Sequence, residues 1–313
     1  IQVIKLNNRN KMIVQAALLF YKENVNQTEI AKQLNVSRPT VATLLKEAVD
    51  RGIVKISIQD SEIMNFEQQE ILAKKYELKT VLISSATASE EEAKQEVGNL
   101  CATFVENNLH RIKNLGIGWG STLNKFAEAA SYHHFEDLSI VPLIGGVDVS
   151  NVKNQSNHLA FILSQKYNCH MDYFYAPAIA ESLEMKETFV KSQFIRDIIQ
   201  KGKNVDMAIT AVGNPIESSS YRKLGYFSEE DACEMKEKNV IGDILATFFN
   251  KNGESVPTNI SKKMIGVNLD DLMNIPEVVV VASGKEKAPS IQHLLKQPII
   301  DHLIIDSEIA TTL

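Results

Sequence analysis

The sequence predicts an α/β protein in two parts, a small helical N-terminal head and a large domain on a mainly parallel sheet that is doubly wound with helices. Two observations support this fold class. Apolar residues recur at helical spacing through most of the first sixty residues, whereas the remainder alternates helical segments with apolar runs such as "VDMAITAVG" and "EVVVVAS". Runs of this kind are typical of strands buried on both faces, and their alternation with helices is typical of a parallel sheet.

Charge is distributed unevenly along the 313 residues. The formal net charge is -6, yet residues 1–60 hold nine Lys and Arg against five Asp and Glu. A basic head on an acidic body is expected where only the head meets a polyanion.

Composition excludes several other classes of protein. No apolar run approaches the roughly 20 residues of a membrane span, and the N-terminus lacks the apolar core of a signal peptide. The three cysteines are far apart and have no paired spacing for disulfides or a zinc site. We therefore expect a soluble protein of the reducing cytoplasm, with no membrane partner.

The first sixty residues predict three helices followed by a strand. Apolar positions between Ile13 and Phe20 mark one face of a helix over 12–22. A second, short helix follows an Asn26 cap and turns at Asn35-Val36, and a third begins at the N-cap Ser37 and ends before Gly52. The alternating "IVKISI" then predicts a wing strand.

Two short helices joined by a tight turn form a helix-turn-helix, and the added strand makes residues 1–60 a winged helix domain. Polar side chains at the start of its third helix suit base edges and phosphates of operator DNA in the major groove. The alternative is a helical bundle for oligomer contacts, whose polar residues are merely solvated. The candidate DNA-binding residues are Gln27, Ser37, Arg38, Pro39, Thr40, Thr43, Lys46 and, in the wing, Lys55.

Residues 61–77 predict a linker helix and residues 78–313 a single large domain. The linker has a narrow apolar stripe that includes Phe66, Ile71 and Leu72. This stripe either pairs between subunits, giving two reading heads for a two-fold DNA site, or packs onto its own domain. Pairing would make the protein a homodimer or a homotetramer.

Five polar, glycine-bearing segments are placed by the pattern at the carboxyl ends of the predicted strands. Ligands of open parallel sheets collect at that edge, although any one such turn could be ordinary architecture. Five in one sheet predict a pocket. The segments are Gly116 to Thr122, Gly145 to Asp148, Gly213 to Pro215, Gly242-Asp243, and Ser283 to Lys287.

The chemistry of these segments suits a small phosphorylated polyol. Ser121, Thr122 and the N–H groups beside them lie at a predicted helix N-terminus, which favours a phosphate, and Lys287 adds a positive charge. Asp148, Asn157 and Asp243 can bind sugar hydroxyls. The glycine spacing matches neither a dinucleotide fingerprint nor a Walker motif, which argues against a dinucleotide or a nucleoside triphosphate as ligand. We expect no cofactor and no metal.

Together, these motifs make the chain resemble the SorC/DeoR-type sugar-responsive bacterial transcriptional regulators along essentially its whole length. The motifs that carry the resemblance are "QTEIAKQLNVSRPTVATLLKEAVDRGIVKI", "LGIGWGSTL", "PLIGG", "AVGNP", "GDI" followed by "FFNKNGE", and "VVASGKEKAPSI". In that family the body resembles glucosamine-6-phosphate deaminase and type A ribose-5-phosphate isomerase, reused as a sensor.

The resemblance implies that phosphate is held by Gly120, Ser121, Thr122 and Lys287, while Gly146, Asn157 and Asp243 face the sugar. Ile144 cannot capture an aldehyde as a lysine there could, so we expect non-covalent binding. In "DVSNVKNQSNHLA", Gln155 and His158 are further candidates, or only part of a solvated helix start. The full set of candidate effector residues is Gly118, Gly120, Ser121, Thr122, Gly145, Gly146, Asp148, Gln155, Asn157, Gly213, Asp243 and Lys287.

The sequence therefore predicts a DNA-binding transcriptional regulator of a carbohydrate-utilisation operon, controlled by a phosphorylated sugar. The alternative is a sugar-phosphate isomerase or deaminase-type enzyme acting on the same ligand. Such an enzyme needs a base near neutral pKa, usually a carboxylate backed by a histidine or lysine, and none of the seven histidines falls inside the five segments. A third reading, an architectural DNA-binding protein, leaves the pocket unexplained.

Overall fold

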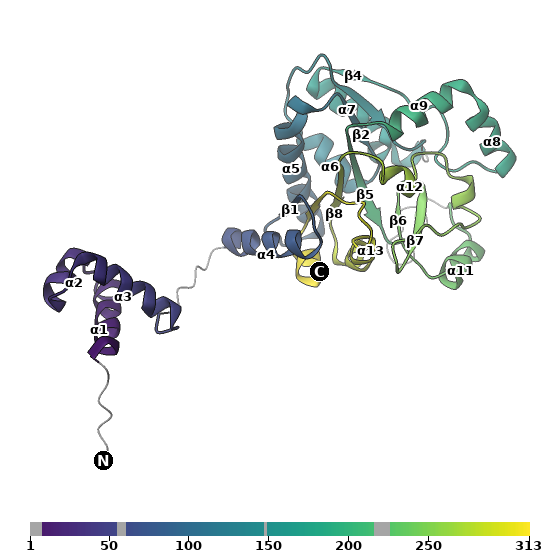
Figure 1. Cartoon of the computed structure of the whole chain (residues 1–313). Coiled ribbons are helices and arrows are strands. Elements are labelled where there is room, and N and C mark those ends of the chain that lie inside the picture. Colours follow the sequence, from purple (N-terminus) through teal and green to yellow (C-terminus); the bar gives the residue numbers. More distant parts are fainter. Residues whose placement is uncertain (1–7, 55–60, 147–148, 216–225) are drawn as a thin grey trace. The chain divides into compact units, whose positions relative to one another are not determined.

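The structure, a computed structural model, describes residues 8–54, 61–146, 149–215 and 226–313. It divides into two compact units, Ile1–Asp60 and Ser61–Leu313 (Figure 1). The helix predicted as a linker is grouped with the second unit. None of the described helices combines the length and the apolar character needed to cross a membrane.

The N-terminal unit is a three-helix assembly with its own core. Ile13, Ile30 and Val41, one from each α-helix, are fully buried against one another. The first helix begins earlier than its apolar pattern predicts and ends in a π-helical turn. The predicted wing lies largely outside the described residues. The elements are α1 (Asn8–Ala17), the π-helix η1 (Leu18–Lys22), α2 (Gln27–Leu34) and α3 (Arg38–Asp50).

The second unit is built on a sheet whose seven parallel strands run in the order β1-β9-β8-β5-β2-β3-β4. An antiparallel hairpin, β6 and β7, continues from the end of β5. The strands are β1 (Thr80–Ile83), β2 (Asn114–Ile117), β3 (Ser139–Pro142), β4 (His170–Met171), β5 (Met207–Gly213), β6 (Val240–Ile244), β7 (Thr247–Asn250), β8 (Val278–Ala282) and β9 (His302–Ile305).

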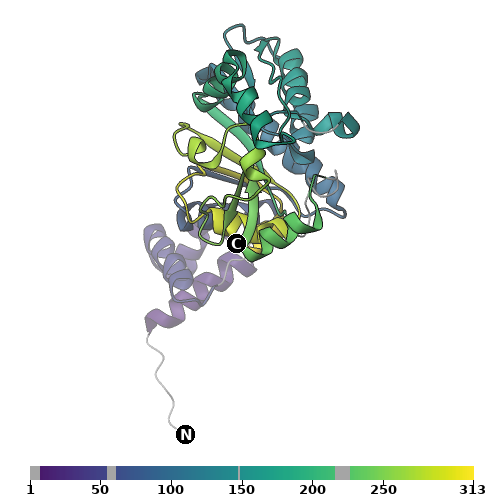
Figure 2. The same ribbon diagram turned by 90° about the vertical axis from the view of Figure 1, so that its right-hand side faces the viewer.

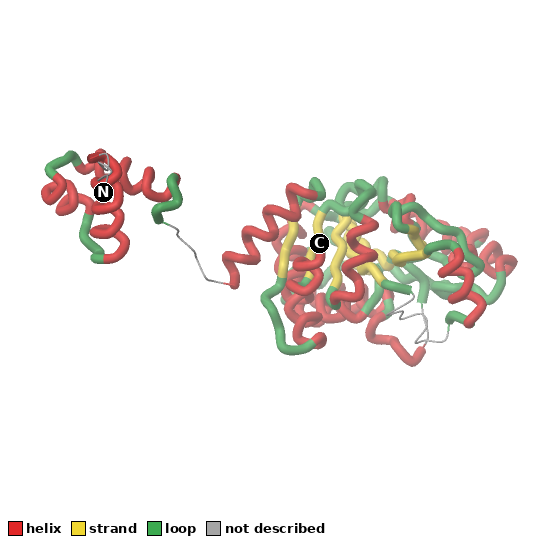
Figure 3. Tube along the Cα trace, turned by 90° about the horizontal axis from the view of Figure 1, so that it is seen from below, coloured by secondary structure: helices red, strands yellow, loops and turns green. Residues whose placement is uncertain are grey.

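Helices cover both faces of this sheet, as Figures 2 and 3 show from two further directions. Alternate strand residues feed two separate cores: Val279 and Val281 of β8 pack with one set of helices, and Val278 and Val280 with the other. Because successive side chains of a strand point to opposite faces, a wholly apolar strand requires a cover on each side. The predicted doubly wound α/β class is confirmed.

The helices of the first face are α5 (Glu90–Asn108), α6 (Ser121–Ala129) and α7 (Ser156–Tyr167). The second face is covered by α4 (Ser61–Lys75), α9 (Gln193–Lys203), α12 (Leu269–Leu272), α13 (Ala288–Leu294) and α14 (Ser307–Thr312). The remaining elements of the described residues are α8 (Leu183–Lys191), α11 (Glu229–Glu237) and the short 3-10 helices η2 (Leu109–Arg111), η3 (Val149–Asn154), η4 (Ser261–Lys263) and η5 (Lys285–Lys287).

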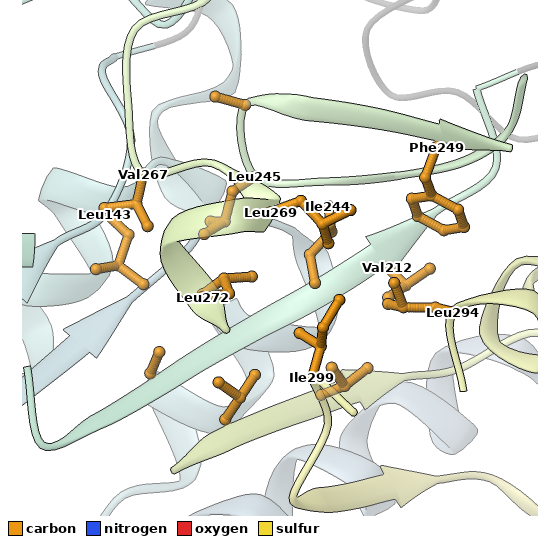
Figure 4. Packing of buried hydrophobic residues seen from close by; sticks show 14 of the residues in the cluster. Leu143, Val212, Ile244, Leu245, Phe249, Val267, Leu269, Leu272, Leu294 and Ile299 are labelled. Carbon is orange, nitrogen blue, oxygen red and sulfur yellow. The ribbon is translucent and has the colours of Figure 1, made fainter. Parts of the chain in front are cut away.

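The hairpin is fixed to the end of β5 by apolar packing. Figure 4 shows Val212 of β5 in the cluster with Ile244 of β6, Phe249 of β7 and Leu294 of α13. All four side chains are essentially inaccessible to solvent. This packing sets the hairpin rigidly against the carboxyl edge of the sheet, where the candidate ligand-binding residues lie.

Candidate effector site and DNA-binding surface

The turn between α2 and α3 is closed by local hydrogen bonds. Asn26 caps α2 by accepting the N–H groups of Thr28 and Glu29 at 3.1 and 3.0 Å. Asn35 ends α2 in the left-handed conformation with φ of 53°, and the N–H of Val36 donates to the carbonyl of Ala31 at 2.9 Å. These features fix the angle between the two helices, as a helix-turn-helix requires.

The candidate DNA-binding residues of α3 form one exposed surface. The six candidates in and just before α3 are all exposed, namely Ser37, Arg38, Pro39, Thr40, Thr43 and Lys46. Gln27, at the start of α2, is half-buried. Lys55 lies outside the described residues.

The hydroxyls of this surface already have partners within the helix. Ser37 caps α3 by accepting the N–H of Thr40 at 3.3 Å, and the two hydroxyl oxygens lie 2.7 Å apart. Thr43 donates to the carbonyl of Pro39 at 3.0 Å. The charged side chains of this surface are Arg38 and Lys46.

The candidate effector residues gather at the carboxyl edge of the sheet. The parallel register of β2 with β5 and of β5 with β8 sets the ends of these three strands side by side. Gly118 extends β2, with its N–H donating to the carbonyl of Ile209 at 2.8 Å. Gly213 ends β5, and the segment that contains Lys287 follows β8.

Gly120 gives α6 an N-terminus without a side-chain cap. Its φ of +133° lies in a region that favours glycine, and its own N–H donates to the carbonyl of Asn154 at 2.9 Å. Ser121, the first helical residue, is exposed, whereas Thr122 is only 3% exposed. The first N–H groups of α6 therefore point at an edge where an anion would satisfy them.

Asp243 and Lys287 bring opposite charges to the same edge. Asp243 is 8% exposed, and its carboxylate lies so close to Gly213 that a Cβ there would be 2.3 Å from Oδ1. Burial raises the pKa of Asp243 to about 7, although the Lys287 charge opposes this shift. Burial also lowers the pKa of Lys287, whose ammonium donates to the carbonyl of Ser283. Both groups are poised to respond to a polar ligand.

The sequence pattern placed Asp243 after the end of a parallel strand, and this placement is wrong. It lies inside β6, paired with Gly213 across the antiparallel β5–β6 ladder. The hairpin returns to the edge of the sheet and delivers the carboxylate there.

Three other candidates are engaged in backbone packing. A Cβ on Gly145 would lie 2.5 Å from the carbonyl oxygen of Ala176, and the N–H of Gly146 donates to that same oxygen at 2.9 Å. The Asn157 amide bonds both the N–H and the carbonyl of Phe174, at 2.9 and 3.0 Å. These contacts explain why glycine stands at position 145 and asparagine at position 157, whereas a Cβ at position 146 would meet Gln155 only at an ordinary 3.5 Å.

Gln155 is the N-cap residue of α7, and Oε1 of its half-buried side chain is 3.5 Å from the Cβ position of Gly146. His158, also half-buried, lies in the first turn of α7. Asp148 lies outside the described residues.

Three further polar residues lie at this edge. Asn214 and Ser283 belong to segments singled out in the sequence but were not named as candidates, and Thr210, inside β5, was missed. Thr210, 1% exposed, lies under Gly118, and the Asn214 amide donates to the Glu286 carbonyl at 3.1 Å, tying two of the edge segments together. Ser283 is fully buried, and its hydroxyl has no partner within the described parts of the chain. A polar residue inside or just after an apolar strand was the available signal in each case.

Comparison with known proteins places this architecture in a family. The sugar-binding domain model matches residues 61–313, and a winged helix-turn-helix DNA-binding model matches residues 17–55. The chain belongs to the SorC/DeoR-type transcriptional regulators. Over 97% of its length this regulator is 29% identical to the deoxyribonucleoside regulator of Bacillus subtilis, of which it covers 97%.

Solved structures agree with this assignment. A DeoR family transcriptional regulator from Listeria monocytogenes is 34% identical, with a TM-score of 0.74 over 80% of this regulator and 99% of that chain. The full-length sorbitol operon regulator SorC of Klebsiella pneumoniae is 25% identical, with a TM-score of 0.75 over 98% and 99% of the two chains. The regulator is thus a DNA-binding protein with a sugar-binding domain, and the enzyme alternative is not supported.

Proposed function

We propose that this regulator controls a carbohydrate-utilisation operon, and that a phosphorylated sugar bound non-covalently at the carboxyl edge of the sheet changes its affinity for operator DNA. The observation that carries the proposal is the uncapped N-terminus of α6 at the same edge of the sheet as Lys287 and the buried Asp243. Free N–H groups, a lysine and a carboxyl that can bind hydroxyls are the complement of a sugar phosphate.

In this proposal the phosphate binds the first N–H groups of α6 and the Ser121 hydroxyl, with the Lys287 charge nearby. Asp243 then faces a hydroxyl of the sugar. Ile144 is completely buried and apolar, so no imine forms at that position. The relatives named for deoxyribonucleosides and sorbitol leave the identity of the sugar open within this chemical class.

On the DNA side, Arg38 would read base edges in the major groove, with Lys46 and Lys55 on phosphates. Two heads are needed for a two-fold operator, so we propose a homodimer or homotetramer. The linker helix supports pairing, because Phe66 and Ile71 are 62% and 63% exposed while Leu72 is buried against the domain. Such a regulator would act in the cytoplasm, where bacterial operator DNA lies.

Thermal-shift measurements against pentose and hexose phosphates test the effector class. A sugar phosphate at 100 times its dissociation constant should stabilise the protein by about 3 kcal/mol. Trp119, the single tryptophan of the chain, lies between Gly118 and Gly120 and gives an independent fluorescence signal of binding. A panel without any stabilising compound would contradict the proposed effector class.

Ser121→Ala then tests the location of the phosphate site. Loss of one charge-assisted hydrogen bond, about 1.5–3 kcal/mol, should weaken affinity by about 10-fold or more. The matched control is Ser131→Ala, an exposed serine just beyond the other end of α6. Equal affinity in both variants would place the phosphate elsewhere.

A further inference from the structure

A chain of contacts links the candidate effector site to the helix that leads toward the DNA-binding unit. It begins at the segment after β8. The N–H of Gly284 donates to Oδ2 of Asp306 at 2.6 Å, and Gly284 adopts a φ of +104°. Asp306 is 3% exposed, and its other oxygen, Oδ1, caps α14 by accepting the N–H of Ile309 at 2.8 Å. One buried carboxylate therefore joins the Lys287 segment to α14.

The opposite end of α14 meets the end of α4. The carbonyl oxygen of Leu313 accepts hydrogen bonds from the Tyr76 hydroxyl at 3.2 Å and from the Lys75 ammonium at 2.5 Å. Ile309 of α14 and Leu72 of α4 are both buried in the core cluster of this face, and Leu313 packs against it. A helix of six residues spans about 9 Å, so α14 is a short, stiff connection between two joints.

The surroundings of both ends of this connection leave room for movement. Beside the Asp306 joint a cavity of about 300 Å³ lies between residues 86–93, 283–286 and 306–308, which leaves room for the segment and the start of α14 to shift. Helix α4 packs against the core through Leu72, which is buried, whereas Phe66 and Ile71 of the same helix are mostly exposed. Gln69 of α4 also accepts a hydrogen bond from the N–H of Ile83 in β1 at 3.1 Å.

We propose that α14 couples the effector site to the linker helix α4, with Asp306 and the Leu313 carbonyl as its two joints. This inference rests on the proposed function for its biological meaning, because a ligand at Lys287 would act on the first joint. A change at that joint passes along α14 to Tyr76 and Lys75. Since coupling between two sites is reciprocal, a change at α4 also reaches the Ser283–Lys287 segment.

Hydrogen exchange on the full-length chain tests the coupling without any ligand. Asp306→Asn weakens the first joint, and we expect the amides of α4 residues 65–75 to exchange about 2- to 10-fold faster, the range set by loss of one hydrogen bond. Tyr76→Phe removes a hydroxyl at the second joint, and the amides of residues 283–287 should exchange faster by a similar factor. Unchanged exchange at the far joint in both variants would overturn the proposal.

Lysine variants supply the matched control. Lys75→Met loses the bond to Leu313, whereas Lys74→Met makes the same charge change at a neighbouring exposed lysine that has no hydrogen bond or ion pair within the described part of the chain. Only Lys75→Met should alter exchange at residues 283–287. An equal effect of both substitutions would show that charge, and not the joint, is responsible, and would also overturn the proposal.

A final comparison separates this inference from the proposed function. Ribose 5-phosphate, glucose 6-phosphate and inorganic phosphate are added to the wild type and to Tyr76→Phe, with Trp119 fluorescence as the signal of binding. A compound that binds both proteins equally, but protects α4 from exchange less in Tyr76→Phe, supports the coupling. Equal protection of α4 in the two proteins would overturn it. If none of the three binds while Asp306→Asn still loosens α4, the coupling stands and the proposed effector class is wrong.

Discussion

Replacing Asp243 with asparagine should stabilise the protein, and more so at high pH. The carboxyl is 8% exposed and its pKa is raised from 3.8 to about 7 by burial. Above pH 3.8 the unfolded chain releases this proton while the folded protein keeps it, so the group lowers stability increasingly until the pH passes about 7. At about 1.4 kcal/mol per pKa unit, the cost is about 2 kcal/mol at pH 5 and about 4 kcal/mol at pH 8. Asparagine has the same shape and no charge to bury.

Urea denaturation of the wild type and Asp243→Asn at both pH values measures this difference. The variant's gain in unfolding free energy should be about 2–3 kcal/mol larger at pH 8 than at pH 5. The variant also loses the attraction between the Asp243 carboxylate and Lys287, which lowers its gain in unfolding free energy at pH 8. The gain should nevertheless remain larger at pH 8 than at pH 5. Asp197→Asn, at an exposed carboxylate of α9, serves as the control. A gain for Asp243→Asn that is the same at both pH values would refute the reasoning.

Three further predictions follow from named contacts. Burial lowers the pKa of His302, so the folded protein favours the neutral imidazole. The free energy of unfolding should therefore fall as the pH drops below about 6.5, the ordinary pKa of histidine. His302→Leu should remove this loss in urea titrations at pH 7.5 and 5.5. Gly145→Ala should destabilise by about 1–3 kcal/mol in thermal unfolding, whereas Gly146→Ala, whose Cβ would meet Gln155 at an ordinary 3.5 Å, should be nearly neutral. Arg38→Ala should cost about 1–3 kcal/mol at its base pair and relax specificity, while Lys46→Ala should weaken all duplexes alike and reduce the salt dependence in anisotropy titrations.

Local signals fixed several elements of this protein from sequence. Asn26 and Ser37 were expected to be N-caps and are, because a cap depends only on a side chain and the two or three N–H groups that follow it. The parallel sheet was evident because the central strands β5 and β8 are apolar on both faces, which no one-sided packing would require.

The sequence by itself therefore determined the helix-turn-helix of the N-terminal part and the doubly wound α/β class of the large domain. It also predicts a ligand at the carboxyl edge of that sheet. Tertiary structure alone decided what individual residues do there. Gly145 is required by the carbonyl of Ala176, Asn157 is bound to the backbone of Phe174, and Asp243 reaches the edge through an antiparallel hairpin. The physical reason is the separation along the chain. Asp306 holds Gly284 across 22 residues and Tyr76 bonds Leu313 across 237, and partners so distant leave no periodic trace in the sequence.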